Sequence, residues 1–360
     1  MQNGKISFSQ LMSMAFLSAL GPVIRLLPWA FARFGGGASF LALLPAAGIL
    51  YIFIYGMSRL LRRGKPGVSL WGLLRASGGP VIGTAVCLLL GLWLLAYTAF
   101  TLRSGVERLI SCVYTEGKPW LLSTVMAALA AAAASGRLKS LAGAGRVLAL
   151  LLGAVMVLVC ALALPGVRVR NLLPDARLDW SGLLWSALAA VNVLSVGVYF
   201  LVFLGDTEPR TLRPGPARLA ALAGLLACLA VTVMTVGTLS APVTEKLQFP
   251  FFVLIRNIRE LKIAERFEAL VIAVWVGADF MLLASLLFML RRLAETVTGR
   301  GCRPVPALAA AAANAAGMLV SDDAFTVHRL SKYAIPLINI VVVFGVIPIM
   351  LRVGKKAKKR

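Results

Sequence analysis

The stretch from Val81 to Leu102 reads VIGTAVCLLLGLWLLAYTAFTL and contains no aspartate, glutamate, lysine or arginine. A helix of about 20 apolar residues crosses the ~30 Å hydrocarbon layer of a bilayer, whereas helices in soluble cores rarely stay uncharged for so long. Five further uncharged stretches of similar length are Ala38–Ser58, Val147–Val167, Trp180–Gly205, Leu219–Thr244 and Tyr333–Leu351. Together these stretches predict an all-α integral membrane protein.

The composition of the whole chain supports this prediction. Hydrophobic residues make up 60% of the 360 residues and charged residues only 14%, whereas soluble domains carry roughly 25% charged residues. The formal net charge of +23 could suggest nucleic-acid binding, but the lysines and arginines lie mainly between the apolar stretches and form no basic domain. We therefore expect the lipid bilayer, and no nucleic acid, as a partner.

We expect about ten transmembrane helices in one polytopic membrane domain, residues 1–360. The predicted spans are 7–33, 38–61, 81–111, 119–136, 145–166, 180–204, 217–242, 264–292, 304–321 and 333–352. The fourth and ninth are mostly alanine, which is only marginally lipophilic, so we expect them to lie buried within the bundle. The chain divides into two five-helix repeats, 1–166 and 180–352, followed by a basic cytoplasmic tail, 353–360.

The basic residues predict the orientation, because positively charged connections resist translocation. They gather after the second, fourth and eighth predicted spans and in the tail: Arg59, Arg62, Arg63, Lys65, Arg75, Arg137, Lys139, Arg146, Arg291, Arg292, Arg300, Arg303 and residues 352–360. This distribution predicts that both termini are cytoplasmic. The segment Met1–Gln10 runs straight into the first apolar stretch, so we interpret it as the start of a retained helix and not as a signal peptide.

Two predicted spans contain interruptions. The first holds Ser18-Ala19-Leu20-Gly21-Pro22, and the sixth holds Asn192-Val193-Leu194-Ser195-Val196-Gly197. Breaks in a spanning helix are tolerated only where protein or water satisfies the backbone, and paired breaks point to a ligand site at the bilayer midplane. Adding a polar patch of the third span, the predicted ligand-binding residues are Ser18, Gly21, Pro22, Ile24, Tyr97, Thr98, Asn192, Ser195 and Gly197.

Two ionisable residues within spans are costly enough to need a role. Arg25 lies just past the Gly21-Pro22 pair, where it either meets a substrate carboxylate or extends to the outer membrane interface. Asp279 lies near the middle of the eighth span. It is either a partner for an ion, an ammonium group or a proton, or a buried partner for an arginine on another helix.

The longest external connection contains an amphipathic segment, Phe249–Glu260. Phe251, Leu254, Ile255, Ile258 and Leu261 recur at helical spacing. The pattern predicts a helix that either lies in the membrane interface or packs across the mouth of the bundle.

Nothing in the chain indicates an enzyme, a cofactor or a metal site. There is one histidine, His328, and no Walker A, HExxH or GxSxG arrangement. The five cysteines are scattered without paired spacing, which predicts neither a zinc site nor a disulfide framework.

Several stretches resemble the endospore germination permease family, the B subunits of nutrient germinant receptors in the amino acid-polyamine-organocation superfamily. The resemblance is carried by Lys5–Leu11 with Gly21 and Pro28, Leu102-Arg103 to Glu107–Ile110, Asn171–Pro174, Phe249-Pro250 to Ile255-Arg256, Ala264–Glu268 and Ala273–Trp275. It runs through nearly the whole chain in length and in the order of spans.

The resemblance implies a LeuT-like fold of ten helices in two inverted five-helix repeats, with helices one and six unwound around a small ligand. It also implies partners, a larger A subunit and a C-subunit lipoprotein, in the spore inner membrane or the cell membrane. Receptors of this kind sense small nutrients, commonly amino acids, and trigger germination.

The chain departs from the family pattern at three places. Ala19-Leu20 stands where an acidic residue often precedes the first-span glycine, and Ser195-Val196-Gly197 stands where relatives carry a glutamate. Glu116–Pro119 replaces a Thr-Pro pair after span three. These departures predict an atypical, more apolar pocket.

Three functions follow from these observations. The first is nutrient sensing by a pocket between helices one, three, six and eight. The second is secondary transport of an amino acid, with Asp279 as the group that couples transport to a proton or cation. The third is a membrane scaffold whose pocket binds nothing.

Overall fold

The computed structural model describes residues 5–62, 68–112, 116–174, 179–257, 264–320 and 324–357. Within these ranges, eight helices are long and apolar enough to cross a membrane. Two shorter apolar helices, Pro119–Ser135 and Val305–Leu319, coincide with the fourth and ninth predicted spans. The prediction of an all-α membrane protein is therefore confirmed, with eight of the ten predicted spans long enough to cross a membrane.

The helical elements follow one another along the described residues, without a β-sheet among them. They are α1 (Phe8–Gly35), η1 (Gly37–Ala42), α2 (Leu43–Arg62), α3 (Leu70–Ser77), α4 (Gly79–Cys112), α5 (Pro119–Ser135), α6 (Leu138–Ala163), η2 (Leu164–Gly166), η3 (Val169–Leu172), α7 (Trp180–Leu194), η4 (Ser195–Asp206), η5 (Pro209–Thr211), α8 (Pro214–Leu239), α9 (Ala241–Lys246), α10 (Pro250–Asn257), α11 (Ala264–Thr298), α12 (Val305–Val320), α13 (Ala324–Arg329), η6 (Leu330–Ala334), α14 (Ile335–Ile340), η7 (Val341–Val346) and α15 (Ile347–Ala357).

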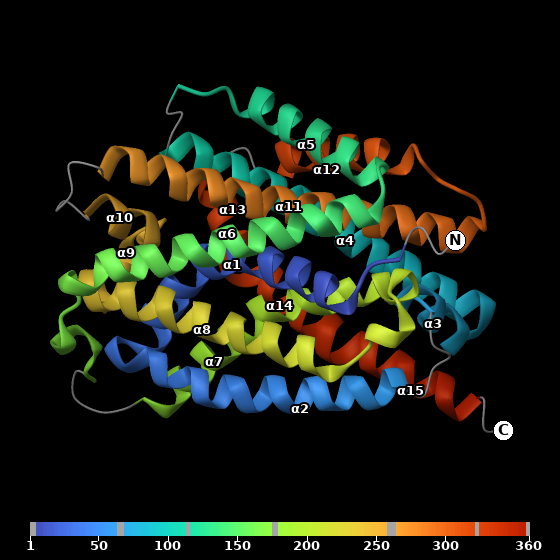
Figure 1. Ribbon diagram of the computed structural model, residues 1–360, viewed down its shortest axis with the longest axis horizontal. Coiled ribbons are helices and arrows are strands. Elements are labelled where there is room, and N and C mark those ends of the chain that lie inside the picture. Colours follow the sequence, from blue (N-terminus) through green and yellow to red (C-terminus); the bar gives the residue numbers. More distant parts are fainter. Residues whose placement is uncertain are drawn as a thin grey trace.

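Helix α1 runs through the middle of the bundle, between α6, α7, α8 and α11 (Figure 1). It begins with a capping box, in which Ser7 and Gln10 each accept a hydrogen bond from the other's backbone N–H. Its apolar residues are buried on every side, which fits a helix that touches other helices and not lipid. The start of α1 and the end of α15 lie at the same end of the bundle (Figure 1).

The predicted interruption of the first helix is wrong. Helix α1 continues through Gly21, Pro22 and Pro28. A proline removes one backbone hydrogen bond and crowds the preceding turn, but the helices packed around α1 hold it in helical geometry. Gly21 has a different reason to lack a side chain, because α11 approaches it closely there.

The predicted interruption of the sixth helix is confirmed, as a change of helix type. The α-helix α7 ends at Leu194, and the chain continues as the 3₁₀ helix η4 from Ser195 to Asp206. Such helices are usually limited to 3–4 residues, and a longer one within a span often marks a hinge. The break therefore begins at Ser195, inside the predicted stretch Asn192–Gly197.

The two alanine-rich helices do not lie inside the bundle as expected. α5 and α12 lie side by side along one edge (Figure 1) and pack against α4. Ala127, Ala130 and Ala131 of α5 are buried, but Leu129 and Leu308 are exposed. One small-residue face of each helix thus allows close packing, while the other faces outward.

The predicted amphipathic segment forms α10, which packs on α8 and α1. Phe251, Leu254 and Ile255 are buried as their spacing predicts, and Phe252 is buried with them. This favours a helix across the bundle mouth over one in the membrane interface. The predicted residues Ile258 to Leu261 lie outside the described residues.

Candidate functional site

A buried ion pair joins three helices near the middle of the bundle. Arg108 of α4 donates a hydrogen bond to the Oδ2 atom of Asp279 on α11, and both side chains are at most 7% exposed. Asp279 in turn lies against α1, where a β-carbon on Gly21 would be 2.6 Å from its Oδ1 atom. Of the two roles expected for Asp279, the structure shows the structural one, a pair with an arginine on another helix.

Further polar groups surround this ion pair. Arg25 lies one turn beyond Gly21 on α1 and donates to the Ser104 hydroxyl at 2.5 Å. Its guanidinium packs on the Phe100 ring, 4.9 Å from the centroid, and is within electrostatic reach of Arg108 and Asp279. Arg25 is therefore held inside the bundle and does not extend to the membrane interface.

Arg103 and Glu107 form a second ion pair on α4, 2.6 Å apart. The cluster of five charged side chains thus holds three arginines and two carboxylates, counted over the described residues. Charges in a membrane interior are costly unless partnered. The excess positive charge favours a site for an anionic group.

Four buried polar atoms of this region form no hydrogen bond within the described structure. They are the Ser18 hydroxyl, Arg25 Nε, Arg108 Nη1 and Trp275 Nε1. The Arg108 guanidinium lies 4.9 Å from the centroid of the Trp275 ring. Because buried polar groups are nearly always paired, these atoms are available to a ligand or to water.

At the end of the bundle near Lys332, the approach to the cluster is nearly closed. A small cavity of about 20 Å³ touches Arg25 and is bordered by Trp29, Ser104, Phe249 and Lys332, among others. This volume holds about one water molecule. The Lys332 ammonium lies 4.0 Å from the centroid of the Trp29 ring, which helps to close this end.

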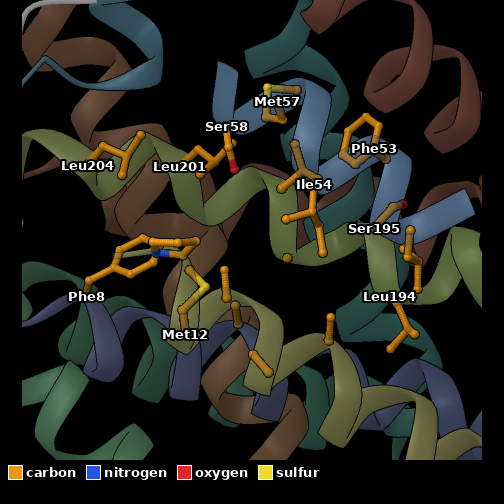
Figure 2. A pocket seen from close by; sticks show the side chains of 18 of the residues that line it. Phe8, Met12, Phe53, Ile54, Met57, Ser58, Leu194, Ser195, Leu201 and Leu204 are labelled. Atoms are coloured by element: carbon orange, nitrogen blue, oxygen red, sulfur yellow. The ribbon is translucent and has the colours of Figure 1, made fainter. Parts of the chain in front are cut away.

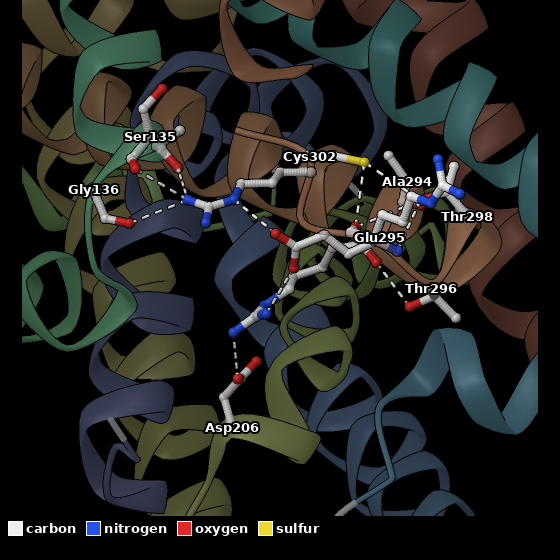
Figure 3. A network of polar contacts seen from close by, with 12 residues as sticks. Ser135, Gly136, Asp206, Ala294, Glu295, Thr296, Thr298 and Cys302 are labelled. Atoms are coloured by element: carbon white, nitrogen blue, oxygen red, sulfur yellow. Dashed lines mark hydrogen bonds and ion pairs between the residues drawn. The ribbon is translucent and has the colours of Figure 1, made fainter. Parts of the chain in front are cut away.

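A polar network closes the opposite end (Figure 3). Arg291 donates to the last carbonyls of α5, at Ala134, Ser135 and Gly136, and to Glu295. Arg292 bonds both Glu295 and Asp206, the last residue of η4. The cluster is therefore enclosed on both sides in this conformation.

The start of α1 is also tied to the end of η4. Ile6 and Thr207 form a parallel β-bridge, with hydrogen bonds of 3.0 Å from Ile6 N–H to Asp206 and from Glu208 N–H to Ile6. The Phe8 N–H adds a bond of 3.0 Å to the Thr211 hydroxyl. The start of the first span and the end of the sixth span are thereby fixed to each other.

At the break in the sixth span, other protein groups form the hydrogen bonds that the polar groups need. Asn339 of α14 donates to the Asn192 carbonyl, the Asn192 Oδ1 atom and the Ser195 hydroxyl, at 2.7–3.1 Å. Tyr199 donates to Asn339, and Trp93 donates to Tyr199 at 2.9 Å. Asn192 and Ser195 are therefore engaged in a network that holds the break in place.

A separate, half-open cavity of about 420 Å³ lies between α1, α2, η4 and α8 (Figure 2). Ser195 and Gly197 border it, together with Ala15 and Ala19 of α1. Most other lining side chains are apolar. It is thus a second space, on a different face of α1 from Ser18, Gly21 and Arg25.

The predicted ligand residues fall into four groups. Gly21, Arg25 and Asp279 come together at the ion-pair cluster, while Ser18 lies about one turn before Gly21 on α1 with a buried, unbonded hydroxyl. Tyr97 lies buried between Trp93 and Phe100, and the Thr98 hydroxyl is bonded to the Leu94 carbonyl. Asn192, Ser195 and Gly197 lie at the helix break, while Pro22 and Ile24 are buried within the unbroken α1.

The sequence reasoning did not identify Arg108, Trp275 and Asn339 as site residues. A signal existed for Arg108, because Arg103, Glu107 and Arg108 all lie inside the predicted span 81–111. Charged residues so far within a span should have been assigned a role. Asn339 carried only the weaker signal of an amide in an otherwise apolar stretch.

No cluster of metal-ligating side chains occurs in the part of the chain that the structure describes.

Comparisons with known proteins show the family and the fold of this chain. A family model described as "Spore germination protein" matches residues 5–297, while no curated protein matches the chain. Among solved structures, the crystal structure of MhsT in complex with L-phenylalanine superposes with a TM-score of 0.69 at 12% identity, covering 98% of this chain and 99% of that one. This likeness shows the fold, the LeuT-like arrangement expected from the sequence.

Proposed function

Since this chain belongs to the spore germination permease family, we propose that it senses a small nutrient as the B subunit of a germinant receptor. The nutrient is an amino acid, bound in its zwitterionic form where α1, α4 and α11 meet. The observation that best supports this proposal is the buried pair of Arg108 and Asp279 against Gly21.

The ion pair contains the two charges that recognise an amino acid. A carboxylate such as Asp279 pairs with an ammonium group, and the planar guanidinium of Arg108 pairs with a carboxylate. A zwitterion that enters between them replaces one internal ion pair with two new ones, so neither Arg108 nor Asp279 is left without an opposite charge. This matters because an unpartnered charge at this depth is costly.

Neighbouring groups extend the site. Arg25 Nε and Arg108 Nη1 are buried donors without a hydrogen bond in the described structure, and both suit a carboxylate. Gly21 leaves room beside the α1 backbone, which Asp279 now occupies. Separation of Asp279 from Arg108 opens this room to the ligand.

The signal is a shift between two arrangements of the bundle. A ligand shifts such an equilibrium only by binding one state more tightly, and this ligand favours the state in which α4 and α11 are separated. The larger A subunit and the C-subunit lipoprotein read the change. The protein acts in the spore inner membrane, with both termini cytoplasmic.

A second candidate is secondary transport, in which the nutrient crosses the membrane. The observation that favours it is the Arg292–Asp206 ion pair between α11 and the end of η4, because an ion pair between two elements can break and re-form. In this case Asp279 couples transport to a proton or cation.

Binding is tested with the purified protein in detergent, by thermal shift against a panel of amino acids and sugars. For an amino acid that binds, the amide without the carboxylate and the acid without the ammonium group are compared. Variants Asp279→Asn and Arg108→Gln are measured beside Glu245→Gln, which removes a carboxylate from the exposed pair with Arg33.

We expect a saturable shift for one amino acid, lost with either analogue and in both cluster variants but kept in Glu245→Gln. A shift for sugars alone would contradict zwitterion recognition. If the folded protein responds to no compound, the chain is a scaffold or its site needs a partner. Uptake of the labelled amino acid into proteoliposomes then separates transport from sensing.

A further inference from the structure

The half-open cavity between α1, α2, η4 and α8 does not share the chemistry of the charged cluster. Figure 2 shows Phe53, Ile54 and Met57 of α2 on one side and Phe8 and Met12 on the other, with Leu201 and Leu204 of η4 between them. Its volume of about 420 Å³ falls within the range of small-molecule pockets, ~300–1,000 Å³.

The polar groups of the cavity wall are few. Among the described residues that line it, the polar side chains are those of Ser58, Ser195 and Arg213. The Ser195 hydroxyl already donates to the Asn192 carbonyl and accepts from Asn339. A sugar or a zwitterion would therefore leave most of its polar groups unpaired, which is unfavourable, whereas an alkyl chain matches the wall.

One end of the cavity suits an anion. Arg213 lines it there and directly precedes Pro214, the first residue of α8. The start of α8 has no side-chain cap. Pro214 and Pro216 carry no N–H, so among the first three residues of the helix Gly215 supplies the backbone donor for an acceptor. A helix N-terminus and an adjacent arginine both attract negative charge.

The cavity borders the lipid-facing surface of the bundle. On α2, Ile52 and Tyr55 are exposed beside the lining residues Phe53 and Ile54. On α8, Leu219 and Leu222 are exposed beside Ala220 and Ala221. Large apolar side chains exposed in a membrane protein face acyl chains, so lipid reaches the cavity from the side.

We propose that this cavity binds an acyl chain of an anionic membrane phospholipid, whose phosphate lies at Arg213 and the start of α8. The chain contacts α1 and η4 together, on the face of α1 away from Gly21. A bound lipid thus stabilises the packing of the inner halves of the first and sixth spans, independently of any nutrient.

The test measures lipid retention by native mass spectrometry of the full-length protein, exchanged from vesicles of mixed phosphatidylglycerol and phosphatidylcholine into detergent. Arg213→Gln removes the anion partner, and Arg218→Gln removes an exposed arginine of the same helix that does not line the cavity. Ala220→Trp fills the cavity, and Leu219→Trp places the same ring on the lipid-facing side.

We expect the wild type to retain phosphatidylglycerol over phosphatidylcholine. Arg213→Gln should retain about fivefold less phosphatidylglycerol than the wild type, which corresponds to the loss of one surface cation near an anionic lipid. Ala220→Trp should lose retention of both lipids, while Arg218→Gln and Leu219→Trp should match the wild type. Equal retention by Arg213→Gln and Arg218→Gln, or retention of free fatty acid but of neither phospholipid, would overturn the proposal.

If the Ala220→Trp variant does not fold, photolabelling of the wild-type protein tests the same cavity. A phosphatidylglycerol with a diazirine in its acyl chain is photolysed with the wild-type protein, and the labelled residues are mapped. Labelling of Met12, Phe53 or Met57 supports the proposal. Labelling confined to outward residues such as Ile52 and Leu222 refutes it.

Discussion

The Asp279 carboxylate on α11 takes the space that a side chain on Gly21 of α1 would need. A β-carbon at Gly21 would lie 2.6 Å from the Asp279 Oδ1 atom, closer than real β-carbons come to other atoms. Asp279 is also fixed from the other side by Arg108. The contact makes the first span sensitive to any movement of the buried ion pair.

Gly21→Ala should therefore lower both stability and ligand binding. The added methyl group pushes Asp279 from Arg108, and overpacking of this kind costs about 1–3 kcal/mol. Gly153→Ala on α6 is the matched control, because nothing lies within 4 Å of its added carbon. The control should be neutral or stabilising, since alanine favours helix over glycine. Thermal unfolding in detergent measures the stability of both variants. Equal melting temperatures for Gly21→Ala and Gly153→Ala would contradict the contact.

Replacing only one residue of the Arg108–Asp279 pair should destabilise the protein more than replacing both. Each single variant, Arg108→Gln or Asp279→Asn, leaves one buried charge without its partner, at a cost of about 3–5 kcal/mol. The double variant should cost less than the sum of the two. Chemical unfolding of all three gives the coupling energy.

The exposed pair of Arg33 and Glu245 provides the comparison for that cycle. Its side chains are 57% and 35% exposed, and exposed pairs contribute about 0–1 kcal/mol. The same double-mutant cycle there should give a coupling near zero. A coupling as small at Arg108 and Asp279 would mean that water screens the buried pair.

Asn339→Ala should loosen the break in the sixth span. It removes the donor to the Asn192 carbonyl and to Ser195, and it leaves Tyr199 without its acceptor. Each unsatisfied buried group costs about 1–3 kcal/mol. Hydrogen exchange should become faster across residues 195–206, while Asn314→Ala, between α5 and α12, should leave that exchange unchanged.

Asp206→Asn should open the bundle at the end of η4. The substitution weakens the bond from Arg292 to the end of η4, while Arg291 and Glu295 keep their own contacts. In a variant whose five natural cysteines are replaced, the thiol introduced by Ser18→Cys reports on whether water-soluble reagents reach this part of α1. A water-soluble maleimide should label this thiol faster when Asp206 is changed, and an unchanged rate would show that Arg292 does not close this end.

Low pH should weaken the start of α7. Asp179 precedes this helix outside the span, and hydrogen bonds from the Gly182 backbone and the Ser181 side chain hold its carboxyl pKa below the ordinary value. A depressed pKa gives stability that is full above the unfolded-state value of about 3.9 and is lost as pH falls through the folded value.

Asp179→Asn tests this assignment. Asparagine caps helices as well as aspartate does but does not titrate. The two proteins should melt alike between pH 5 and 8 and separate only below about pH 4, where the wild type loses stability. Parallel melting curves down to pH 3 would show that the carboxylate does not stabilise the helix.

Much of the fold could be predicted from the sequence, because lipid imposes a strict rule on composition. Uncharged stretches such as Val81–Leu102 can hardly be anything but spans, and the structure places α4 there. The alanine-rich spans were located correctly as well. Their place at an edge was not predicted, since alanine suits both close packing and exposure.

The site was predicted less completely, for two physical reasons. Whether Gly21-Pro22 breaks a helix depends on the neighbours that hold it, and α1 is packed on all sides. The partner of Asp279 depends on the rotation of two helices about their axes, and Arg108 lies 171 positions away in the chain. Short-range patterns contain neither piece of information, so the two roles of Asp279 could not be separated.

The bridge between Ile6 and Thr207 has a consequence for how this protein moves. A movement of the start of α1 alone would break the hydrogen bonds that Ile6 and Phe8 make to Asp206, Glu208 and Thr211. The end of η4 must travel with it. The start of α1 and the end of η4 therefore form one connected unit, which the 3₁₀ helix from Ser195 to Asp206 joins to α7.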